Sequence, residues 1–227
     1  MKAKESLLRG AVVGLRHLHP RGYMTLFRAC PELEIVCACE RDAAVREAFC
    51  AEFGLKGYAT LEEMLGSECL DLAAIFLPHA ECEAAAIACA ERGVHLMVEK
   101  PAATSSAALN RMAAAAARNH VLLTTGYAWR YHPAVRQVKT IVVAGLIGKL
   151  VSVEARLCAG RMDRYRAGQA DWMLERRQSG GGPMMNLGVH WIDLIGHLTG
   201  EPIHEVCAVN THSSATYDIE DSSLVLM

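Results

Sequence analysis

The chain has 227 residues, of which 52% are apolar, and its formal net charge is -2. A chain of this length and composition can bury a core, so an intrinsically disordered protein is excluded. The 23 Lys and Arg residues are balanced by 25 Asp and Glu residues, which leaves no basic excess for a phosphate backbone. We therefore expect no nucleic-acid partner.

The sequence carries no targeting or membrane signal. The N-terminus, MKAKESLLRG, lacks the apolar stretch of a signal peptide, and no later run reaches the roughly 18 apolar residues of a membrane-spanning helix. The nine cysteines are an odd number, and Cys37, Cys39, Cys82 and Cys89 lie in apolar segments, which favours reduced core thiols. We expect a soluble cytoplasmic protein without membrane contacts, and no metal, because no Cys/His cluster has zinc spacing.

Short apolar runs alternate with helical segments through the first half of the chain. The expected strands are Gly10–Leu15, Leu33–Cys39, Leu72–Leu77, Val94–Val98 and Val121–Gly126. The expected helices are Arg21–Ala29, Asp42–Phe53, Ala80–Arg92 and Ser105–Asn119. Because these strands show no polar alternation, both faces of the sheet are expected to be covered by helices. The pattern predicts an α/β, doubly wound parallel sheet.

The pattern changes after Gly126. The expected elements are a helix over His132–Gly145, a strand over Leu150–Gly160, a polar stretch over Arg161–Gly182, a helix over Pro183–Gly200, and strands over His204–Asn210 and Ser222–Met227. We predict a Rossmann domain over residues 1–126 and an α+β domain with a largely antiparallel open sheet over residues 127–227. The final apolar run, SSLVLM, suggests that the second domain is incomplete.

The first strand runs into GLRHLHPRGY, where a dinucleotide fold places its phosphate loop. Gly14 stands at the expected position, but Arg16 and His19 occupy the positions of the second and third glycines. Taken alone, the loop fits a nucleotide site and an ordinary strand-to-helix turn equally well. Glu40 ends the second strand, where an acid can bind both ribose hydroxyls and repel a 2'-phosphate. Glu40 could equally be a solvated residue at a strand end. Because Arg41 offsets the charge of Glu40 only in part, NAD is preferred over NADP.

A later motif is more specific. Glu99-Lys100-Pro101 follows an apolar strand and precedes a helix, which places Lys100 at the carboxyl edge of the sheet. This motif resembles the EKP motif of the glucose-fructose oxidoreductase and inositol dehydrogenase family (Gfo/Idh/MocA). Three further stretches agree in order and spacing: AAIFLPHAECEAAAIACAERGVHLMVEKP, TTGYAWRYHPAVRQVK and SGGGPMMNLGVHWIDLIGHLTG. The resemblance extends from about residue 10 to the last residue.

The resemblance implies an NAD(P)-dependent oxidoreductase. Such enzymes transfer a hydride between nicotinamide and a hydroxyl or carbonyl carbon of a sugar, cyclitol or related polyol, and they commonly form homo-oligomers through the C-terminal sheet. Loops reading GLxHxH occur in the family beside the glycine-rich form. The implied cofactor contacts are Gly14, Leu15, Arg16, His17, Glu40, Arg41, Leu77, Pro78, His79, Glu99 and Lys100.

The resemblance also implies the catalytic residues Lys100, His190 and Asn186. Lys100 would stabilise the developing alkoxide, with Glu99 orienting the lysine or the ribose, and His190 would act as acid or base. Asn186 stands where many members carry Asp, and an amide cannot take a proton, which places a His-Asp relay in doubt. Asp193 could substitute or could pair elsewhere. The competing interpretation of Lys100 is a surface lysine, and that of His190 is a core histidine whose hydrogen bonds are satisfied.

The domain crossover, GYAWRYHP, matches the family segment that lines the cleft between cofactor and substrate. We predict substrate contacts for Tyr127, Arg130 and His132, although Arg130 fits a structural ion pair equally well. Trp172 is predicted to bind substrate from the polar stretch, which also contains Arg161, Arg164, Tyr165 and Arg166. A solvated loop is the alternative for that stretch.

Two other functions are compatible with the motifs. The missing glycines and Asn186 allow a non-catalytic NAD(P)-binding regulatory or scaffold protein of the same fold. Lyase or hydrolase chemistry through a transient oxidation is the third possibility, and a tightly retained cofactor would indicate it.

Overall fold

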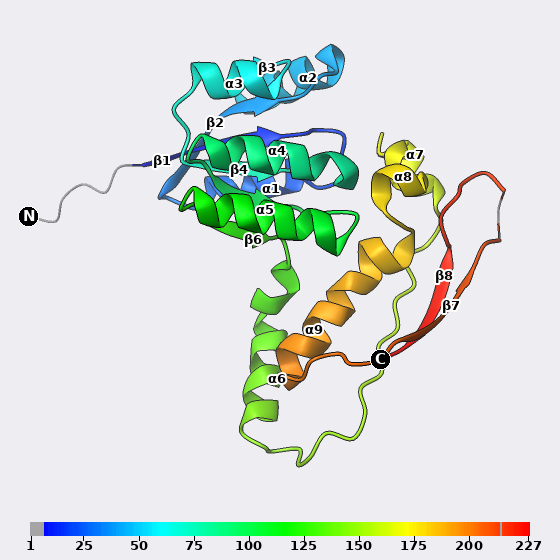
Figure 1. Ribbon diagram of the computed structural model, residues 1–227. Coiled ribbons are helices and arrows are strands. Elements are labelled where there is room, and N and C mark those ends of the chain that lie inside the picture. The colour runs from blue at the N-terminus through cyan, green and yellow to red at the C-terminus, as the bar shows by residue number, and fades with distance from the viewer. Residues whose placement is uncertain (1–6, 214) are drawn as a thin grey trace, which may run out of the picture.

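A computed structural model describes residues 7–213 and 215–227. The first half is a six-stranded parallel sheet in the order β3-β2-β1-β4-β5-β6, with helices on both faces (Figure 1). The strands are β1 (Leu8–Val13), β2 (Leu33–Cys39), β3 (Lys56–Tyr58), β4 (Leu72–Ile75), β5 (His95–Val98) and β6 (Leu123–Thr125). The helices are α1 (Pro20–Arg28), α2 (Ala43–Phe53), α3 (Leu61–Ser67), α4 (His79–Glu91) and α5 (Ser106–Arg118). The predicted doubly wound parallel sheet is confirmed.

The alternation of side chains along the strands divides the core into two layers. Ala11 and Val13 of β1 pack in one cluster with residues of α3, α4 and α5. Val12, between them, packs in a second cluster with α1 and α2, and is fully buried. Both faces of the second half of β1 are therefore covered, which is why Ala11-Val12-Val13 is an uninterrupted apolar run. The four cysteines in apolar segments, Cys37, Cys39, Cys82 and Cys89, are buried free thiols.

Two short elements were not predicted. β3 is three residues long and lies at one edge of the sheet, where it pairs with Cys37–Cys39 of β2. Its segment includes Lys56 and Gly57, so it shows no apolar run. α3 follows, and its N-cap Thr60 accepts a hydrogen bond from the Glu63 amide (3.2 Å). That Thr-x-x-Glu spacing is a helix-start signal from which α3 could have been predicted.

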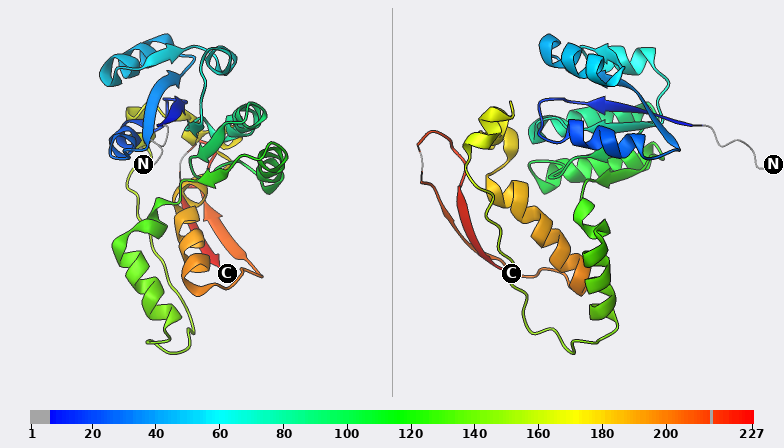
Figure 2. Two further views of the ribbon diagram at one scale, coloured as in Figure 1. Left: turned by 90° about the vertical axis from the view of Figure 1, so that its left-hand side faces the viewer. Right: turned by 180° about the vertical axis from the view of Figure 1, so that it is seen from behind.

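The second half packs two long helices side by side and ends in a hairpin-like pair of strands (Figures 1 and 2). Its elements are η1 (Ala128–Tyr131), α6 (Pro133–Val143), α7 (Asp163–Ala167), η2 (Asp171–Leu174), α8 (Arg176–Ser179), η3 (Met184–Gly188), α9 (Val189–Thr199), β7 (Cys207–Thr211) and β8 (Ser222–Leu226). β7 and β8 pair antiparallel, with Cys207 opposite Leu226. The antiparallel sheet predicted for the second half is thus confirmed as a two-stranded sheet.

The strand predicted over Leu150–Gly160 is wrong. A segment becomes a strand only when its backbone pairs with a neighbour, and within the described part of the chain residues 149–160 join no ladder. The Val151 side chain is 94% exposed as a result. The helix predicted over Pro183–Gly200 is present in two parts, because Met184–Gly188 forms a π-helix before α9.

Among the residues that the structure describes, no helix is long and apolar enough to cross a membrane. The same residues contain no group of three or more His, Cys, Asp or Glu side chains that could hold a metal ion.

Candidate active site

The carboxyl ends of β1, β4 and β5 meet at one edge of the sheet, which is the edge where ligands bind in such folds. Gly14 follows β1 with φ of +85°, a conformation that favours glycine. A Cβ there would lie 2.8 Å from the Leu77 amide nitrogen. The chain therefore turns tightly after β1 and passes directly beside the segment after β4.

Glu40 is fixed beside the loop that follows Gly14. Its Oε2 accepts a hydrogen bond from the Leu15 amide (2.9 Å) and its Oε1 accepts one from the Asp42 amide (3.1 Å). Arg41 points elsewhere, because its guanidinium lies 3.5 Å from the Glu81 carboxylate at the start of α4. The end of β2 thus presents a carboxylate whose nearest basic neighbour in sequence is already paired.

Two histidines of the loop, His17 and His19, of which His19 stands at a glycine position, connect the loop to the EKP segment. The His19 amide donates to His17 Nδ1 (3.1 Å), and the two rings lie edge to face with centroids 4.5 Å apart. His19 Nδ1 lies 3.1 Å from Glu99 Oε2. Arg16 is exposed on the same loop. Imidazole side chains therefore cover this loop, whereas a glycine-rich loop exposes its backbone amides.

Lys100 is buried, with 2% of its surface exposed. Its Nζ donates to the Asn186 backbone oxygen (2.8 Å) and to Asn186 Oδ1 (2.9 Å), which joins the sheet edge to the π-helix. The Lys100 amide donates to Glu99 Oε1 (2.9 Å). Burial lowers the pKa of Lys100 below its ordinary value, although the Glu99 charge opposes this shift.

Three buried histidines surround Lys100. Burial, with His19 and Lys100 as further causes, lowers the pKa of His17 well below its usual value. Burial also lowers the pKa of His79 and of His190 to about 4, and in both the Lys100 charge adds to the effect. Within the described residues, His17 Nε2, His79 Nε2 and His190 Nδ1 have no hydrogen-bond partner. These nitrogens are available to a polar ligand, so the donor set fits a dinucleotide and a hydroxylated substrate.

His190 sits against aromatic rings from the crossover segment. The Trp129 ring stacks on its imidazole at 4.3 Å with an interplanar angle of 12°, and the Tyr127 ring meets it edge to face at 6.3 Å. Arg130 does not reach this ring: its Nε donates to Asp193 Oδ2 (2.7 Å), and its Nη2 bonds the other oxygen. Asp193 is therefore engaged by Arg130 rather than by His190.

His132 lies outside this cluster. Its Nδ1 accepts a hydrogen bond from the Ala134 amide (3.2 Å), so it is the N-cap of α6, and its side chain is exposed.

The polar stretch of residues 161–182 folds over the loop after β1. Trp172 Nε1 donates to the Arg16 backbone oxygen (2.7 Å), and the indole meets the His79 ring edge to face at 4.8 Å. His79 Nδ1 in turn bonds the Ser179 backbone oxygen (2.7 Å). Trp172 therefore lies with the residues predicted to contact the cofactor, and not with Arg130 or His132.

Sequence reasoning missed Trp129 and Glu220. Glu220 is 4% exposed, its Oε1 accepts from the Gly182 amide (2.8 Å), and a Cβ at Gly182 would lie 1.9 Å from the Glu220 backbone oxygen. The glycine run Gly180-Gly181-Gly182 is the signal for such a close approach, but it does not say which segment approaches.

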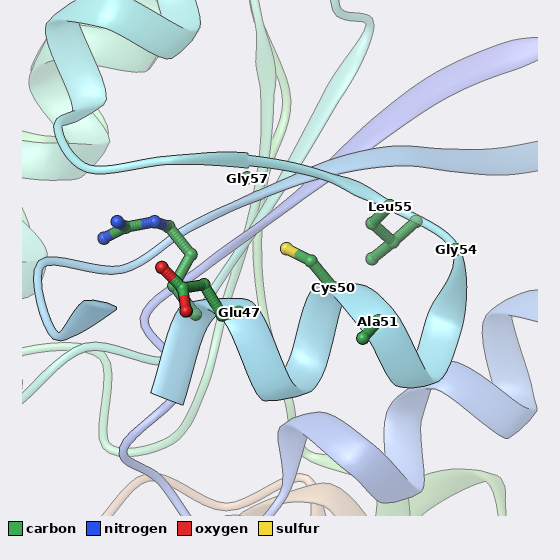
Figure 3. Close-up of a pocket in the computed structure, with 7 residues that line it drawn as sticks. Glu47, Cys50, Ala51, Gly54, Leu55 and Gly57 are labelled. Atoms are coloured by element: carbon green, nitrogen blue, oxygen red, sulfur yellow. The ribbon is translucent and has the colours of Figure 1, made fainter. Parts of the chain in front are cut away.

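A pocket of about 520 Å³ lies away from these residues. It lies between α2 and the edge strand β3, and Cys50 points across it toward Gly57 (Figure 3). None of the residues predicted for the site lines it.

Comparison with known proteins places both halves in one family. A model described as an oxidoreductase family with an NAD-binding Rossmann fold matches residues 8–127, and a model of the GFO/IDH/MocA C-terminal domain matches residues 135–227.

Three relatives illustrate the match. A protein of Amycolatopsis mediterranei, provisionally named a UDP-kanosamine synthase oxidoreductase subunit, is 31% identical over 85% of this chain and 52% of its own length. The D-glucoside 3-dehydrogenase of Escherichia coli is 24% identical over 96% of this chain and 65% of its own length. The WlbA dehydrogenase of Chromobacterium violaceum, solved with NADH and UDP-GlcNAcA, has a TM-score of 0.89 at 24% identity and shares the fold over 98% of this chain and 64% of its own. The chain spans between half and two thirds of the length of these relatives.

Proposed function

The chain belongs to the Gfo/Idh/MocA oxidoreductase family, and on that premise we propose that it transfers a hydride between NAD and a hydroxyl-bearing carbon of a sugar, cyclitol or related polyol. The observation that carries this proposal is Lys100, a buried lysine at the sheet edge whose Nζ is held by Asn186. Relatives named for nucleotide sugars and glucosides support a sugar substrate.

The proposed chemistry needs a group that removes the hydroxyl proton and stabilises the alkoxide. Bound NAD supplies the hydride acceptor. Lys100 has a lowered pKa, so its neutral amine can accept the hydroxyl proton, and the resulting ammonium returns it in the reverse direction. His190 is the second proton-transfer group: its imidazole is neutral near pH 7, because its pKa is about 4, and its Nδ1 has no partner among the described residues.

We propose NAD rather than NADP as the cofactor. The Glu40 carboxylate is fixed beside the loop by the Leu15 and Asp42 amides, and it would repel a 2'-phosphate. Arg41, which could compensate, is paired with Glu81. The proposed cofactor contacts are Gly14, Leu15, Arg16, His17, Glu40, Arg41, Leu77, Pro78, His79, Glu99 and Lys100. Trp172 joins them through its contacts with Arg16 and His79, while Tyr127, Arg130 and His132 remain proposed substrate contacts.

Three further proposals concern the domain division, the cellular location and the oligomeric state. We propose a division near residues 126 and 127 into a cofactor domain and a substrate domain, a cytoplasmic location, and a homo-oligomer formed through the C-terminal sheet.

The experiment is a single-turnover assay of NAD reduction with a panel of nucleotide sugars, glucosides and cyclitols. Lys100→Met should abolish turnover, whereas Lys149→Met, which removes an exposed lysine, should behave as the wild type. Normal turnover by Lys100→Met would refute the assigned role. If no compound of the panel is turned over but calorimetry shows NAD binding, the regulatory or scaffold function is supported. Three residues favour that alternative: Arg16 and His19 at the glycine positions, and Asn186 in place of Asp.

A further inference from the structure

A chain of hydrogen bonds leads from Lys100 into the polar stretch. Lys100 Nζ donates to Asn186 Oδ1 (2.9 Å), Asn186 Nδ2 donates to the Tyr165 hydroxyl oxygen (2.7 Å), and Arg164 Nη2 donates to the same oxygen (2.9 Å). Tyr165 lies on α7, far in sequence from both Lys100 and Asn186. These hydrogen bonds therefore join the proposed catalytic lysine to a tyrosine for which the sequence predicts no role in the site.

The direction of these hydrogen bonds follows from the groups at the two ends. A lysine ammonium and an arginine guanidinium only donate. Asn186 must therefore present its oxygen to Lys100, which leaves its NH2 group facing the Tyr165 hydroxyl, and that hydroxyl oxygen accepts from both sides. Only one of the two orientations of the Asn186 amide satisfies both neighbours.

Tyr165 is rigid enough to select that orientation. Its side chain is 2% exposed and packs in an apolar cluster with Trp172, Met173 and Ile219. Arg164 is anchored as well, because its Nη1 donates to the Ala159 backbone oxygen (2.9 Å) and its guanidinium lies 4.8 Å from the Tyr165 ring centroid. The hydroxyl is thus held at a fixed point beside Asn186.

The need for such a residue comes from the amide at position 186. A carboxylate offers an acceptor oxygen in either orientation, whereas a rotated amide would turn its NH2 group toward the Lys100 ammonium. We propose that Tyr165 is a positioning residue: its hydroxyl holds the Asn186 amide so that the oxygen faces Lys100 Nζ. This inference rests on the proposed function of Lys100.

The other charged and titratable groups near Lys100 cannot take over this task. Glu99 uses Oε1 for the Lys100 amide and has Oε2 beside His19, and the three buried histidines are neutral near pH 7 because their pKa values are lowered. The Arg164 charge lowers the pKa of Lys100, and burial lowers it more. The Glu99 charge stabilises the ammonium form, but the hydrogen bonds that Nζ donates among the described residues go to the two Asn186 oxygens.

The test measures the titration of Lys100 directly by NMR of the Lys ¹³Cε resonance, assigned with Lys100→Met. Tyr165→Phe removes the orienting hydroxyl, so the Lys100 midpoint should fall by about one pH unit, a tenfold change in the equilibrium. Asn186→Asp should raise the midpoint. In the Asn186→Asp background, Tyr165→Phe should raise the midpoint further or leave it unchanged, because a tyrosine that donates to a carboxylate competes with Lys100 for it.

The matched control is Tyr217→Phe. Tyr217 packs against the same apolar cluster, but its hydroxyl donates to Asp221 Oδ2 (3.2 Å), so its loss should leave the Lys100 midpoint unchanged. An equal shift from Tyr165→Phe in both backgrounds, or no shift in either, overturns the positioning role.

The kinetic part of the test separates this inference from the proposed function. If the chain turns over a polyol, Tyr165→Phe should lower kcat more than it raises KM and should move the pH profile of kcat with the NMR midpoint. If it turns over none, the proposed function fails, while the NMR titration still decides whether Tyr165 orients Asn186.

Discussion

Arg130 and Asp193 form a two-point ion pair that links the segment before α6 to α9, with Arg130 Nε 2.7 Å from Asp193 Oδ2. The Asp193 side chain is 8% exposed and the Arg130 side chain is 42% exposed. The pair engages the carboxylate that could have assisted His190, and it forms the structural ion pair that was the alternative interpretation of Arg130.

Asp193→Asn should destabilise the protein by about 1–2 kcal/mol, a magnitude reduced by the exposure of Arg130. The pKa of His190 should stay far below 6.5 in this variant, since burial is the main cause of its shift to about 4. Urea unfolding measures the first effect and ¹H NMR of the imidazole the second. A return of His190 to an ordinary titration would show that Asp193 controls it.

Gly14→Ala should destabilise the protein by roughly 2 kcal/mol or more, because the new Cβ meets the Leu77 amide and the backbone keeps a positive φ. Gly66→Ala is the matched control: Gly66 lies in α3 with nothing within 4 Å of an added Cβ, so this change should be neutral or stabilising by up to about 1 kcal/mol. Thermal unfolding of both variants measures the difference, and equal effects would contradict the steric argument.

Stability should fall as the pH is lowered from about 7 to about 4. His79 and His190 have folded pKa values of about 4 against an ordinary 6.5, so between these values the unfolded chain binds more protons and acid favours unfolding. Each histidine should contribute up to about 1.4 kcal/mol per pH unit in that window.

Urea midpoints across this pH range measure that slope. His79→Asn keeps a donor for the Ser179 oxygen and should make the slope shallower, as should His190→Gln. A slope that neither substitution alters would assign the acid sensitivity to other groups.

Trp172→Phe should weaken the packing of residues 161–182 on the loop after β1. It deletes the donor to the part-buried Arg16 oxygen (2.7 Å), which should lower stability by about 1–2 kcal/mol and raise the Kd for NAD. Trp191→Phe is the comparison, because the buried Trp191 Nε1 has no partner among the described residues. Calorimetric NAD titration of both variants gives the measurement; matching losses of affinity would show that the Arg16 contact is unimportant.

Local patterns predicted most of the sheet and the position of Lys100. β2 begins and ends at the predicted residues, and Ser105 caps α5 by accepting from the Ala108 amide (3.2 Å). These features depend on neighbouring residues in sequence, which is why periodicity and capping residues reveal them. β3 was missed because three residues with a central glycine carry no periodicity.

Contacts between distant segments could not be predicted in the same way. The alternation in LVSVEA is typical of a strand, but pairing depends on a neighbour that the local sequence does not name, and residues 149–160 have none within the described chain. Trp172 was predicted to touch substrate from its place in a polar stretch, and its bond to Arg16 spans 156 residues. Arg130 likewise pairs with Asp193, 63 positions away, because α6 and α9 pack side by side.

The three bonds that complete the proposed site join residues 86, 100 and 156 positions apart, namely Lys100 with Asn186, His79 with Ser179 and Arg16 with Trp172. During synthesis, all six strands of the parallel sheet leave the ribosome before any residue of α7, α8 or α9. Until those helices are made, Lys100 Nζ lacks its two acceptor oxygens on Asn186. The parallel sheet is therefore synthesised in full before the residues that complete the site, so an N-terminal domain that folds first would do so without them.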